Sequence, residues 1–418
     1  MHNTKISLER IVATVSIFAL TFLIVFSRRQ DILLHAQPWA EDGVIWMKGI
    51  YEGGFWSSIL YPANGYYQTI SRMTYGIGLL FGLSKAPLVA NIIAILIRCF
   101  FVMFVLSDRM KFVALKYRFL FVLYFLLMPN IAEAYVNVTN AHWYLSLYLL
   151  LVVISDDAST TPWKVHDFAL LIISSLSGPF VIFIAPCLIL KRISQNKGIK
   201  SAIINIKPFD VVMAACCLIQ IIAILTSADG SRSHAPLGAT FSVLANVISY
   251  RVVGGSLFDN ELISPMASMT ALNTCIFALL AVVTLIFFVR QDWRFKSAVI
   301  FPVLMIGFAL AKPMMSLTLP QWPALLIPGG GERYFIITNI AFFSLIIFIC
   351  SKLDEHTRNL SILLPIALIV LLNQSYSINN LPDVGYQEDV AKFETLPTGE
   401  SMKIRINPNP WWVELIKK

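Results

Sequence analysis

Charged residues are scarce in this chain, where Asp, Glu, Lys and Arg make up 13% of the 418 residues. Soluble domains carry about 25% charged residues, so a soluble enzyme or binding domain is excluded as the class of protein. The hydrophobic share is instead 57%, and the mean hydropathy is +0.72. The sequence therefore predicts an all-α polytopic membrane protein.

Two kinds of sequence motif are also absent. Neither the dinucleotide pattern GxGxxG nor the phosphate loop GxxxxGK[ST] occurs, so no recognisable site for ATP or a nucleotide sugar is expected. The cysteines show no paired spacing in a polar loop, so neither a disulfide framework nor a zinc site is indicated. All six lie in apolar segments: Cys99, Cys187, Cys216, Cys217, Cys275 and Cys350.

Basic residues occur in short clusters between the apolar runs and give a net charge of +8. This arrangement indicates the cytoplasmic loops of a membrane protein rather than a surface for nucleic acid. The first apolar run, residues 11–26, ends in bulky residues followed by Arg28 and Arg29, without a small-x-small cleavage site. We therefore interpret this run as a retained anchor rather than a signal peptide.

Apolar segments divide the chain into about nine transmembrane helices. The expected spans are residues 11–26, 86–106, 117–129, 141–155, 209–226, 266–289, 297–312, 334–351 and 359–373. The basic clusters at 109–118 and 191–207 contain almost no acidic residues, which places both of them inside the cell. This arrangement puts the N-terminus inside and the C-terminus outside.

Segment 167–190 must then enter and leave the membrane on the same side. Its centre is Ser177-Gly178-Pro179, a break that predicts a helical hairpin or re-entrant segment. The alternative is one kinked span, with residues 69–84 supplying the missing crossing. Either way, a transmembrane body at 1–373 precedes an exported tail at 374–418. The outer loops of the body are 27–68, 227–265 and 313–333.

Two adjacent acids, Glu41 and Asp42, follow the first span in the stretch WAEDGVIWMKGIYEGGFW. The apolar residues behind them recur at helical spacing, which predicts a short amphipathic helix at the membrane interface. One acid is expected to cap this helix. The other, with Asp42 as first choice, is expected to act as a general base whose pKa is raised by partial burial. The alternative is a pair of solvated acids at a helix start.

Aromatic residues surround these acids, and Trp39 and Trp46 are expected to stack on sugar faces. The alternative is an aromatic belt at the bilayer surface. His142 stands at the outer entrance of the span 141–155, in the stretch NVTNAHWYL. It is a further candidate for lining a substrate cavity, and simple interfacial anchoring is the alternative.

A second stretch, PQWPALLIPGGGERYF, precedes the span at 334–351. Backbone N–H groups in a glycine run can approach an anion closely, so Gly330 and Gly331 are candidate phosphate-binding residues. Arg333 can bind a phosphate through a two-pronged hydrogen bond, with Glu332 and Tyr334 beside the substrate. The alternative is a flexible connector that ends in a snorkelling arginine.

These features together resemble the membrane-embedded glycosyltransferases of the C-type superfamily. The nine-span plan with a re-entrant segment is similar to phage-type serotype-converting O-antigen glucosyltransferases. At residue level the likeness is confined to Ala40-Glu41-Asp42-Gly43 and Gly331-Glu332-Arg333-Tyr334-Phe335.

The resemblance implies transfer of a sugar, expected to be glucose, from a polyprenyl-phosphate donor. The acceptor would be a lipid-linked or O-antigen glycan at the periplasmic face of the bacterial inner membrane. Asp42 or Glu41 would take the acceptor proton, and Arg333 would stabilise the departing phosphate. No cofactor is expected, and adjacent acids in place of a DxD motif give no indication of a divalent metal. A small flippase and a donor-synthesising enzyme would act in the same pathway.

Two other functions fit the same pattern. A polysaccharide polymerase would use similar outer residues and would change the length of the glycan rather than add one side-branch sugar. A flippase or transporter predicts charged residues in the middle of spans and two paired halves. The spans here carry few central charges and no internal repeat, which favours an enzyme.

Overall fold

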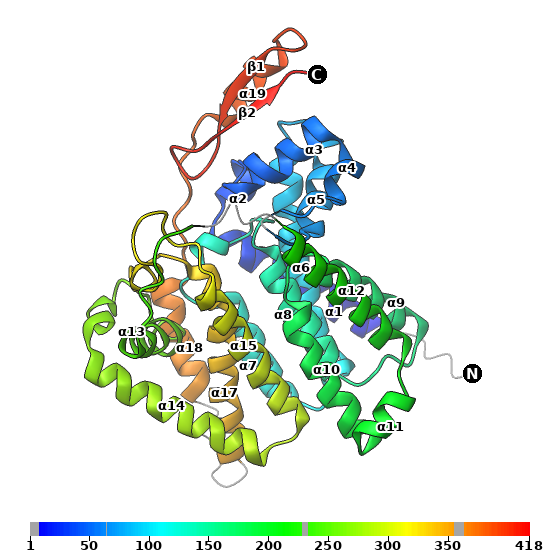
Figure 1. Cartoon of the computed structure of the whole chain (residues 1–418), viewed down its shortest axis with the longest axis vertical. Coiled ribbons are helices and arrows are strands. Elements are labelled where there is room, and N and C mark those ends of the chain that lie inside the picture. Colours follow the sequence, from blue (N-terminus) through cyan, green and yellow to red (C-terminus); the bar gives the residue numbers. More distant parts are fainter. Residues whose placement is uncertain (1–7, 64, 228–232, 355–362) are drawn as a thin grey trace.

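The computed structural model describes residues 8–63, 65–227, 233–354 and 363–418, and it confirms a helical polytopic membrane protein (Figure 1). The strands in these ranges are β1 (Ser401–Arg405) and β2 (Trp412–Ile416), an antiparallel pair close to the C-terminus. All remaining regular elements in these ranges are helices. A helix suits a membrane because its backbone N–H and C=O groups bond to one another where lipid offers no partner.

Within the described ranges, six helices are long and apolar enough to cross a membrane. They are α1 (Leu8–Arg28), α6 (Ala86–Leu106), α12 (Pro208–Thr226), α14 (Thr270–Arg290), α15 (Trp293–Ala311) and α17 (Ile336–Asp354), the last preceded by η7 (Glu332–Phe335). Three further expected spans are shorter helices: α7 (Leu115–Leu127), α8 (Ala141–Ile154) and α18 (Leu363–Ser375). Thus each expected span is helical, although residues 359–362 of the last one lie outside the described residues.

Apart from the two helices of segment 167–190, the remaining elements are short. The α-helices are α2 (Asp31–Leu34), α3 (Lys48–Gly53), α4 (Phe55–Ile59), α5 (Thr69–Leu79), α11 (Ile199–Ile204), α13 (Phe241–Val247), α16 (Gln321–Ala324) and α19 (Tyr386–Glu394). The π-helices are η1 (Asp42–Met47) and η5 (Ile248–Gly254), and the 3-10 helices are η2 (Asp108–Met110), η3 (Ala132–Ala134), η6 (Ser264–Ser268) and η7.

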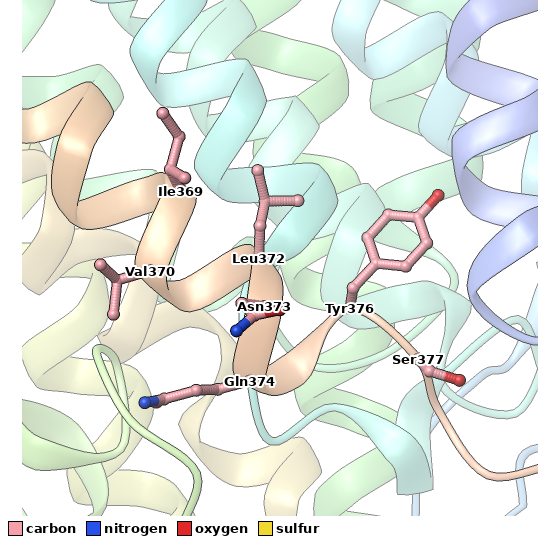
Figure 2. A pocket seen from close by; sticks show the side chains of 7 residues that line it. All are labelled: Ile369, Val370, Leu372, Asn373, Gln374, Tyr376 and Ser377. Atoms are coloured by element: carbon pink, nitrogen blue, oxygen red, sulfur yellow. The ribbon is translucent and has the colours of Figure 1, made fainter.

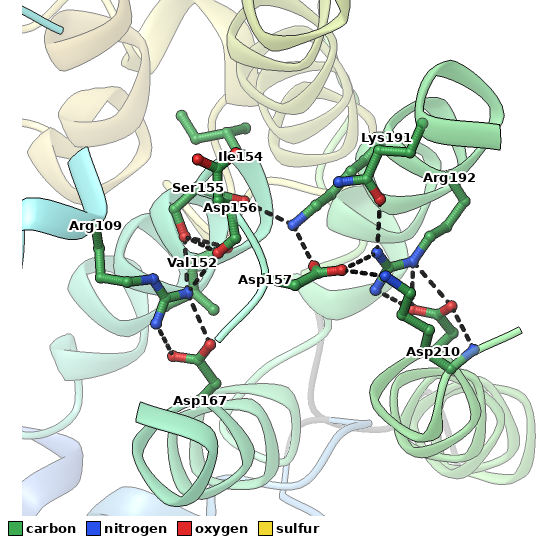
Figure 3. Close-up of polar contacts among 12 residues, drawn as sticks. Arg109, Val152, Ile154, Ser155, Asp156, Asp157, Asp167, Lys191, Arg192 and Asp210 are labelled. Carbon is green, nitrogen blue, oxygen red and sulfur yellow. Dashed lines mark hydrogen bonds and ion pairs between the residues drawn. The ribbon is translucent and has the colours of Figure 1, made fainter. Parts of the chain in front are cut away.

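Basic residues from several helix ends meet at one side of the bundle, which we call the basic end (Figure 3). Arg109, which follows α6, donates to the Asp167 carboxylate at 2.8 Å. Lys191 and Arg192 both pair at 2.7 Å with Asp157, which follows α8. The opposite side carries residues 29–63 and 65–68, the segment between α7 and α8, and the C-terminal tail, and we call it the tail end. The expected cytoplasmic clusters therefore share one end of the molecule.

Segment 167–190 forms the expected hairpin. Its helices α9 (Thr161–Ser175) and α10 (Val181–Asn196) both reach the basic end, through Asp167 and Lys191. The turn between them lies at the tail end, where a Cβ on Gly178 would lie 3.4 Å from the His142 ring at the start of α8. Gly178 has a φ of 124°, a backbone conformation that residues other than glycine rarely adopt.

The alternative crossing at residues 69–84 does not occur. The N–H of Ile70 on α5 donates to Ser177 Oγ at 2.9 Å, and Ser71 Oγ donates to the Val138 carbonyl at 2.9 Å. Both partners lie at the tail end, so α5 caps the hairpin turn instead of spanning the bundle.

The C-terminal tail folds as a small α+β unit over the first loop (Figure 1). Residues of α19 and the β1–β2 hairpin share one core, with Tyr386, Phe393 and Ile404 fully buried. The Ala40 N–H donates to the Asn407 carbonyl, and a Cβ on Gly43 would lie 2.7 Å from Ile406. The tail therefore covers the segment that carries the two adjacent acids.

Candidate functional site

Asp42 is buried at the start of η1, with 2% of its surface exposed. Its carboxylate accepts hydrogen bonds from the N–H groups of Thr139 at 2.8 Å and Val138 at 3.3 Å. Burial raises the pKa of Asp42 to about 7, although the hydrogen bonds from Thr139 and Val138 oppose that shift. Asp42 thus anchors η1 to residues 131–140, which we call the 131–140 loop.

Glu41 directly precedes Asp42 and is only half-buried. It occupies the residue before η1, yet no side-chain hydrogen bond caps that helix, so the expectation of a capping acid is wrong. The negative charge of Glu41 acts on the Arg333 guanidinium, which places the two groups in one electrostatic environment. Of the two adjacent acids, Glu41 is the one that solvent reaches.

The η1 segment also differs from the expected interfacial helix. Met47 is fully buried, and Ile50 is 7% exposed. These apolar residues face the protein, because η1 packs against α5 and against β2 of the C-terminal tail. A helix that is sandwiched in this way cannot lie with its apolar face in lipid. Contacts with distant parts of the chain therefore fix its position.

Arg333 lies in η7, directly before α17, and its position depends on Glu133 of the 131–140 loop. Its Nη1 donates to Glu133 Oε1, and its backbone N–H donates to Glu133 Oε2 at 3.2 Å. Its Nη2 makes longer contacts of 3.3 Å with the Met314 carbonyl and the Tyr334 hydroxyl. One edge of the guanidinium is therefore held by a carboxylate, and the other has weaker partners.

Glu332 has a structural partner as well. Its carboxylate accepts the backbone N–H of Glu133 at 3.0 Å, and its side chain is buried. Residues 332 and 333 thus both bind the 131–140 loop, which also binds Asp42. Segments that are far apart in the sequence converge on this loop.

The glycine run has a conformational role. Gly331 adopts a φ of 63°, and a Cβ there would lie 2.5 Å from Met315 Sδ. The sequence predicted that the Gly330 N–H binds a phosphate. In the structure this N–H donates to the Ile327 carbonyl at 3.1 Å. The run turns the chain tightly into η7 and so directs Arg333 toward Glu133.

The two candidate tryptophans differ in exposure. Trp46 is 1% exposed, and its Nε1 donates to Thr139 Oγ1 at 2.7 Å, so it offers no face for sugar stacking. Trp46 therefore packs beside Asp42 instead of stacking on a sugar. Trp39 is half-buried and lies beside Asn407 of the tail through a parallel bridge.

His142 and Tyr334 flank the other side of the 131–140 loop. His142 is buried at the start of α8 and stacks on Phe180, with ring centroids 5.2 Å apart. It packs against the hairpin turn. The Tyr334 hydroxyl accepts the Met314 N–H at 3.0 Å and stays half-exposed next to Arg333.

Sequence reasoning missed Glu133, Thr139 and Arg72 as neighbours of the candidate residues. Glu133 did leave a signal, because it is the one charged residue between the apolar runs 117–129 and 141–155. Thr139 left no such signal, since a threonine in a loop is common. Arg72 lies on α5, whose position only the structure defines.

One cavity lies away from these residues and another borders the 131–140 loop. An open groove of about 680 Å³ follows the last turn of α18 (Figure 2). Its lining residues are Ile369, Val370, Leu372, Asn373, Gln374, Tyr376 and Ser377. A second cavity, of about 10 Å³, is lined partly by Trp39 and Asn407. Within the described ranges, no group of three or more His, Cys, Asp or Glu residues could hold a metal ion.

No protein-family model matches this chain. No curated protein matches it either. Among solved structures, it is similar to the crystal structure of ArnT from Cupriavidus metallidurans bound to undecaprenyl phosphate, with 13% sequence identity and a TM-score of 0.43. The match covers 92% of this chain and 71% of that one. A likeness at this level assigns no function, so the proposal below rests on this chain's own residues.

Proposed function

We propose that this membrane protein is a glycosyltransferase that uses a polyprenyl-phosphate sugar as its donor. The observation that carries the proposal is the convergence of Asp42 and Arg333 on the 131–140 loop at the tail end, with the charge of Glu41 acting on Arg333. A carboxylate next to a guanidinium is the pair that transfer of a glycosyl group from a phosphate requires.

The reaction divides into a proton transfer and a phosphate departure. A carboxylate takes the proton of the acceptor hydroxyl, and the oxygen of that hydroxyl forms a bond to the anomeric carbon. The bond from that carbon to the phosphate oxygen breaks, and its electron pair leaves with the polyprenyl phosphate. The sugar carries oxocarbenium-like positive charge between these two events, which a nearby carboxylate stabilises.

Glu41 is our choice as the proton acceptor. Its side chain is half-exposed, whereas both oxygens of Asp42 already accept backbone N–H groups. A base must reach the proton that it removes within about 3 Å or through one water. We therefore assign Asp42, the first choice from the sequence, to positioning Glu41 through η1.

Arg333 would stabilise the departing phosphate with its Nη2 edge. The two 3.3 Å contacts of that nitrogen are long for charge-assisted hydrogen bonds, so a phosphate oxygen can replace them. Glu133 keeps the guanidinium in place during this exchange.

Backbone strain at the same place supports a functional role. Ala40, directly before Glu41, has a φ of 40°, and Val136 in the 131–140 loop has a φ of 55°. Left-handed conformations are unfavourable for alanine and more so for a β-branched residue, and such strain is often stored at functional sites.

The finer parts of the proposal follow from the family resemblance. They are glucose as the sugar, an O-antigen or lipid-linked glycan as the acceptor, and the periplasmic face of a bacterial inner membrane as the place. A small flippase and a donor-synthesising enzyme would supply the donor lipid.

The test is sugar transfer from labelled polyprenyl-phosphate glucose in membranes matched for protein level. Glu41→Gln keeps the shape of the side chain and removes proton acceptance, so turnover should fall by about 10²–10⁴-fold. Glu261→Gln is the matched control, because Glu261 is an exposed acid in another loop of the tail end. Parent-level transfer by Glu41→Gln would contradict its role as base. A product that grows by many repeats would indicate the polymerase instead.

A further inference from the structure

Arg72 is a buried arginine without a charged partner. It lies on α5 with 4% of its surface exposed. Its Nε has no hydrogen-bond partner, and across the described ranges its guanidinium makes no hydrogen bond or ion pair. An unpaired buried cation is costly for a folded protein, so its presence needs an explanation.

Other buried arginines have polar partners for part of the guanidinium, although the Nε atoms of Arg29 and Arg251 and the Nη2 of Arg251 also lack hydrogen bonds. Arg28 donates to four backbone carbonyls, and Arg98 donates to the carbonyls of Ala94 and Ala134. Arg29 pairs with Asp31 at 3.4 Å. Arg72 differs from these arginines because, within the described ranges, none of its guanidinium nitrogens has a hydrogen-bond or ion-pair partner.

The position of Arg72 ties it to the candidate site. Its guanidinium lies over the Trp46 ring, 5.2 Å from the centroid. Trp46 in turn donates to Thr139 Oγ1, and the Thr139 N–H holds Asp42. A Cβ on Gly49 would lie 3.6 Å from Arg72 Nη1, so the guanidinium lies against the first turn of α3. Arg72 is therefore part of the same cluster as Asp42.

Electrostatics point the same way. Burial lowers the pKa of Arg72, and no carboxylate opposes that shift. Arg333, in contrast, already shares its charge with Glu133. A phosphate that reached Arg72 would meet a guanidinium whose charge no carboxylate offsets within the described ranges.

We propose that Arg72 binds a phosphate group at the site, with Trp46 holding the plane of its guanidinium. This inference rests on the proposed function, in which the group is the phosphate of the polyprenyl donor and product. A planar guanidinium can offer two parallel N–H groups to phosphate oxygens. Arg72 then provides the positive charge that balances the departing phosphate, and Arg333 assists it.

The experiment measures binding of polyprenyl phosphate to the purified full-length protein in nanodiscs. Arg72→Gln should weaken binding by about 10- to 100-fold, as expected for the loss of one charge-assisted pair of hydrogen bonds. Arg72→Lys should recover only part of the loss, because an ammonium lacks the planar fork. Lys48→Gln is the matched control, since it removes the same charge from the exposed face of α3.

Three further arms separate the explanations. Polyprenol, which lacks the phosphate, should bind equally to the parent and to Arg72→Gln. Inorganic phosphate should bind much more weakly than the lipid; equal affinity would overturn the lipid as the source of the phosphate. The melting temperature of ligand-free Arg72→Gln should be unchanged or higher, because an unpaired buried charge is removed. A lower melting temperature would instead indicate a structural arginine and overturn the proposal.

The outcomes also distinguish this inference from the proposed function. If Arg72→Gln binds polyprenyl phosphate as tightly as the parent, the phosphate role of Arg72 is overturned while transfer that depends on Glu41 stands. If the parent binds the lipid through Arg72 and transfers no sugar, the phosphate site stands and the proposed reaction is wrong.

Discussion

Arg333 and Glu133 form an ion pair that joins the start of α17 to the 131–140 loop. The Arg333 backbone N–H donates to the same carboxylate at 3.2 Å, so Glu133 fixes both the main chain and the side chain of this residue. Glu133 thereby positions the guanidinium and also reduces the net charge that a phosphate would meet.

The pair should act as a unit. Glu133→Gln and Arg333→Lys are each expected to lower turnover about tenfold, and the double variant should fall little further, because paired residues are not additive. The measurement is the turnover of each variant in membranes matched for protein level. Additive losses would show that the two residues act independently.

The activity should depend on the ionisation of Asp42. Its pKa is raised to about 7 by burial, so the carboxylate changes charge near neutral pH. The ionised form accepts two N–H groups better than a carboxyl group does, and turnover should therefore rise with pH through about 7. The pH profile of transfer measures this, and Asp42→Asn should remove the step. A profile that is flat from pH 6 to 8 would contradict it.

Stability should change in the opposite direction. The folded-state pKa of Asp42 lies above that of an unfolded aspartate, about 3.9, so the folded state holds an extra proton between these values. The free energy of unfolding should then fall as pH rises from about 4 to 7 and stay level above that. Thermal unfolding in detergent tests this, with Asp42→Asn as the variant that lacks the slope.

At the basic end, two neighbouring acids should differ strongly in their effect on stability. Asp157→Asn leaves buried Lys191 and Arg192 without a shared partner and should cost about 1–3 kcal/mol of unfolding free energy. Asp156 pairs with Arg294 but is 62% exposed, so Asp156→Asn should cost about 0–1 kcal/mol. Denaturation of the purified variants measures both values. Equal effects would mean that Asp157 does not lock the hairpin ends.

The pKa of Asp157 gives the same contact a pH signature. Burial alone would raise this pKa, yet the charge of Lys191 and the hydrogen bonds from its basic partners lower it below the usual value. The stabilisation is then present above the pKa of an unfolded aspartate and is lost as pH falls through the lower folded-state value. Asp157→Asn should therefore reduce the loss of stability in acid.

The charge clusters predict that the tail end is exported. A reporter that is active only outside the cytoplasm should be active when fused after Lys418 and silent when fused after Lys200. The activity of the two fusions measures the orientation directly. The reverse pattern would place the candidate site on the cytoplasmic side and contradict transfer to a periplasmic glycan.

The sequence by itself determined the class of protein and the positions of the helices. Hydropathy and charge act locally, so each apolar run specifies a helix and each basic cluster specifies an end of the bundle. The Gly178-Pro179 break is also local, because both residues restrict the backbone at their own positions, and it correctly predicted the hairpin. Glu41, Asp42 and Arg333 stood out because charge is rare in an apolar chain.

Only the tertiary structure decided which of these residues are buried and which are paired. Trp46 and Asp42 are covered because α5 and the C-terminal tail pack over η1. Glu133 reaches Arg333 across two hundred positions of the chain. Arg72 lies over Trp46, and within the described ranges no carboxylate pairs with it. Such contacts depend on how distant segments meet in three dimensions, and neither periodicity nor composition records that.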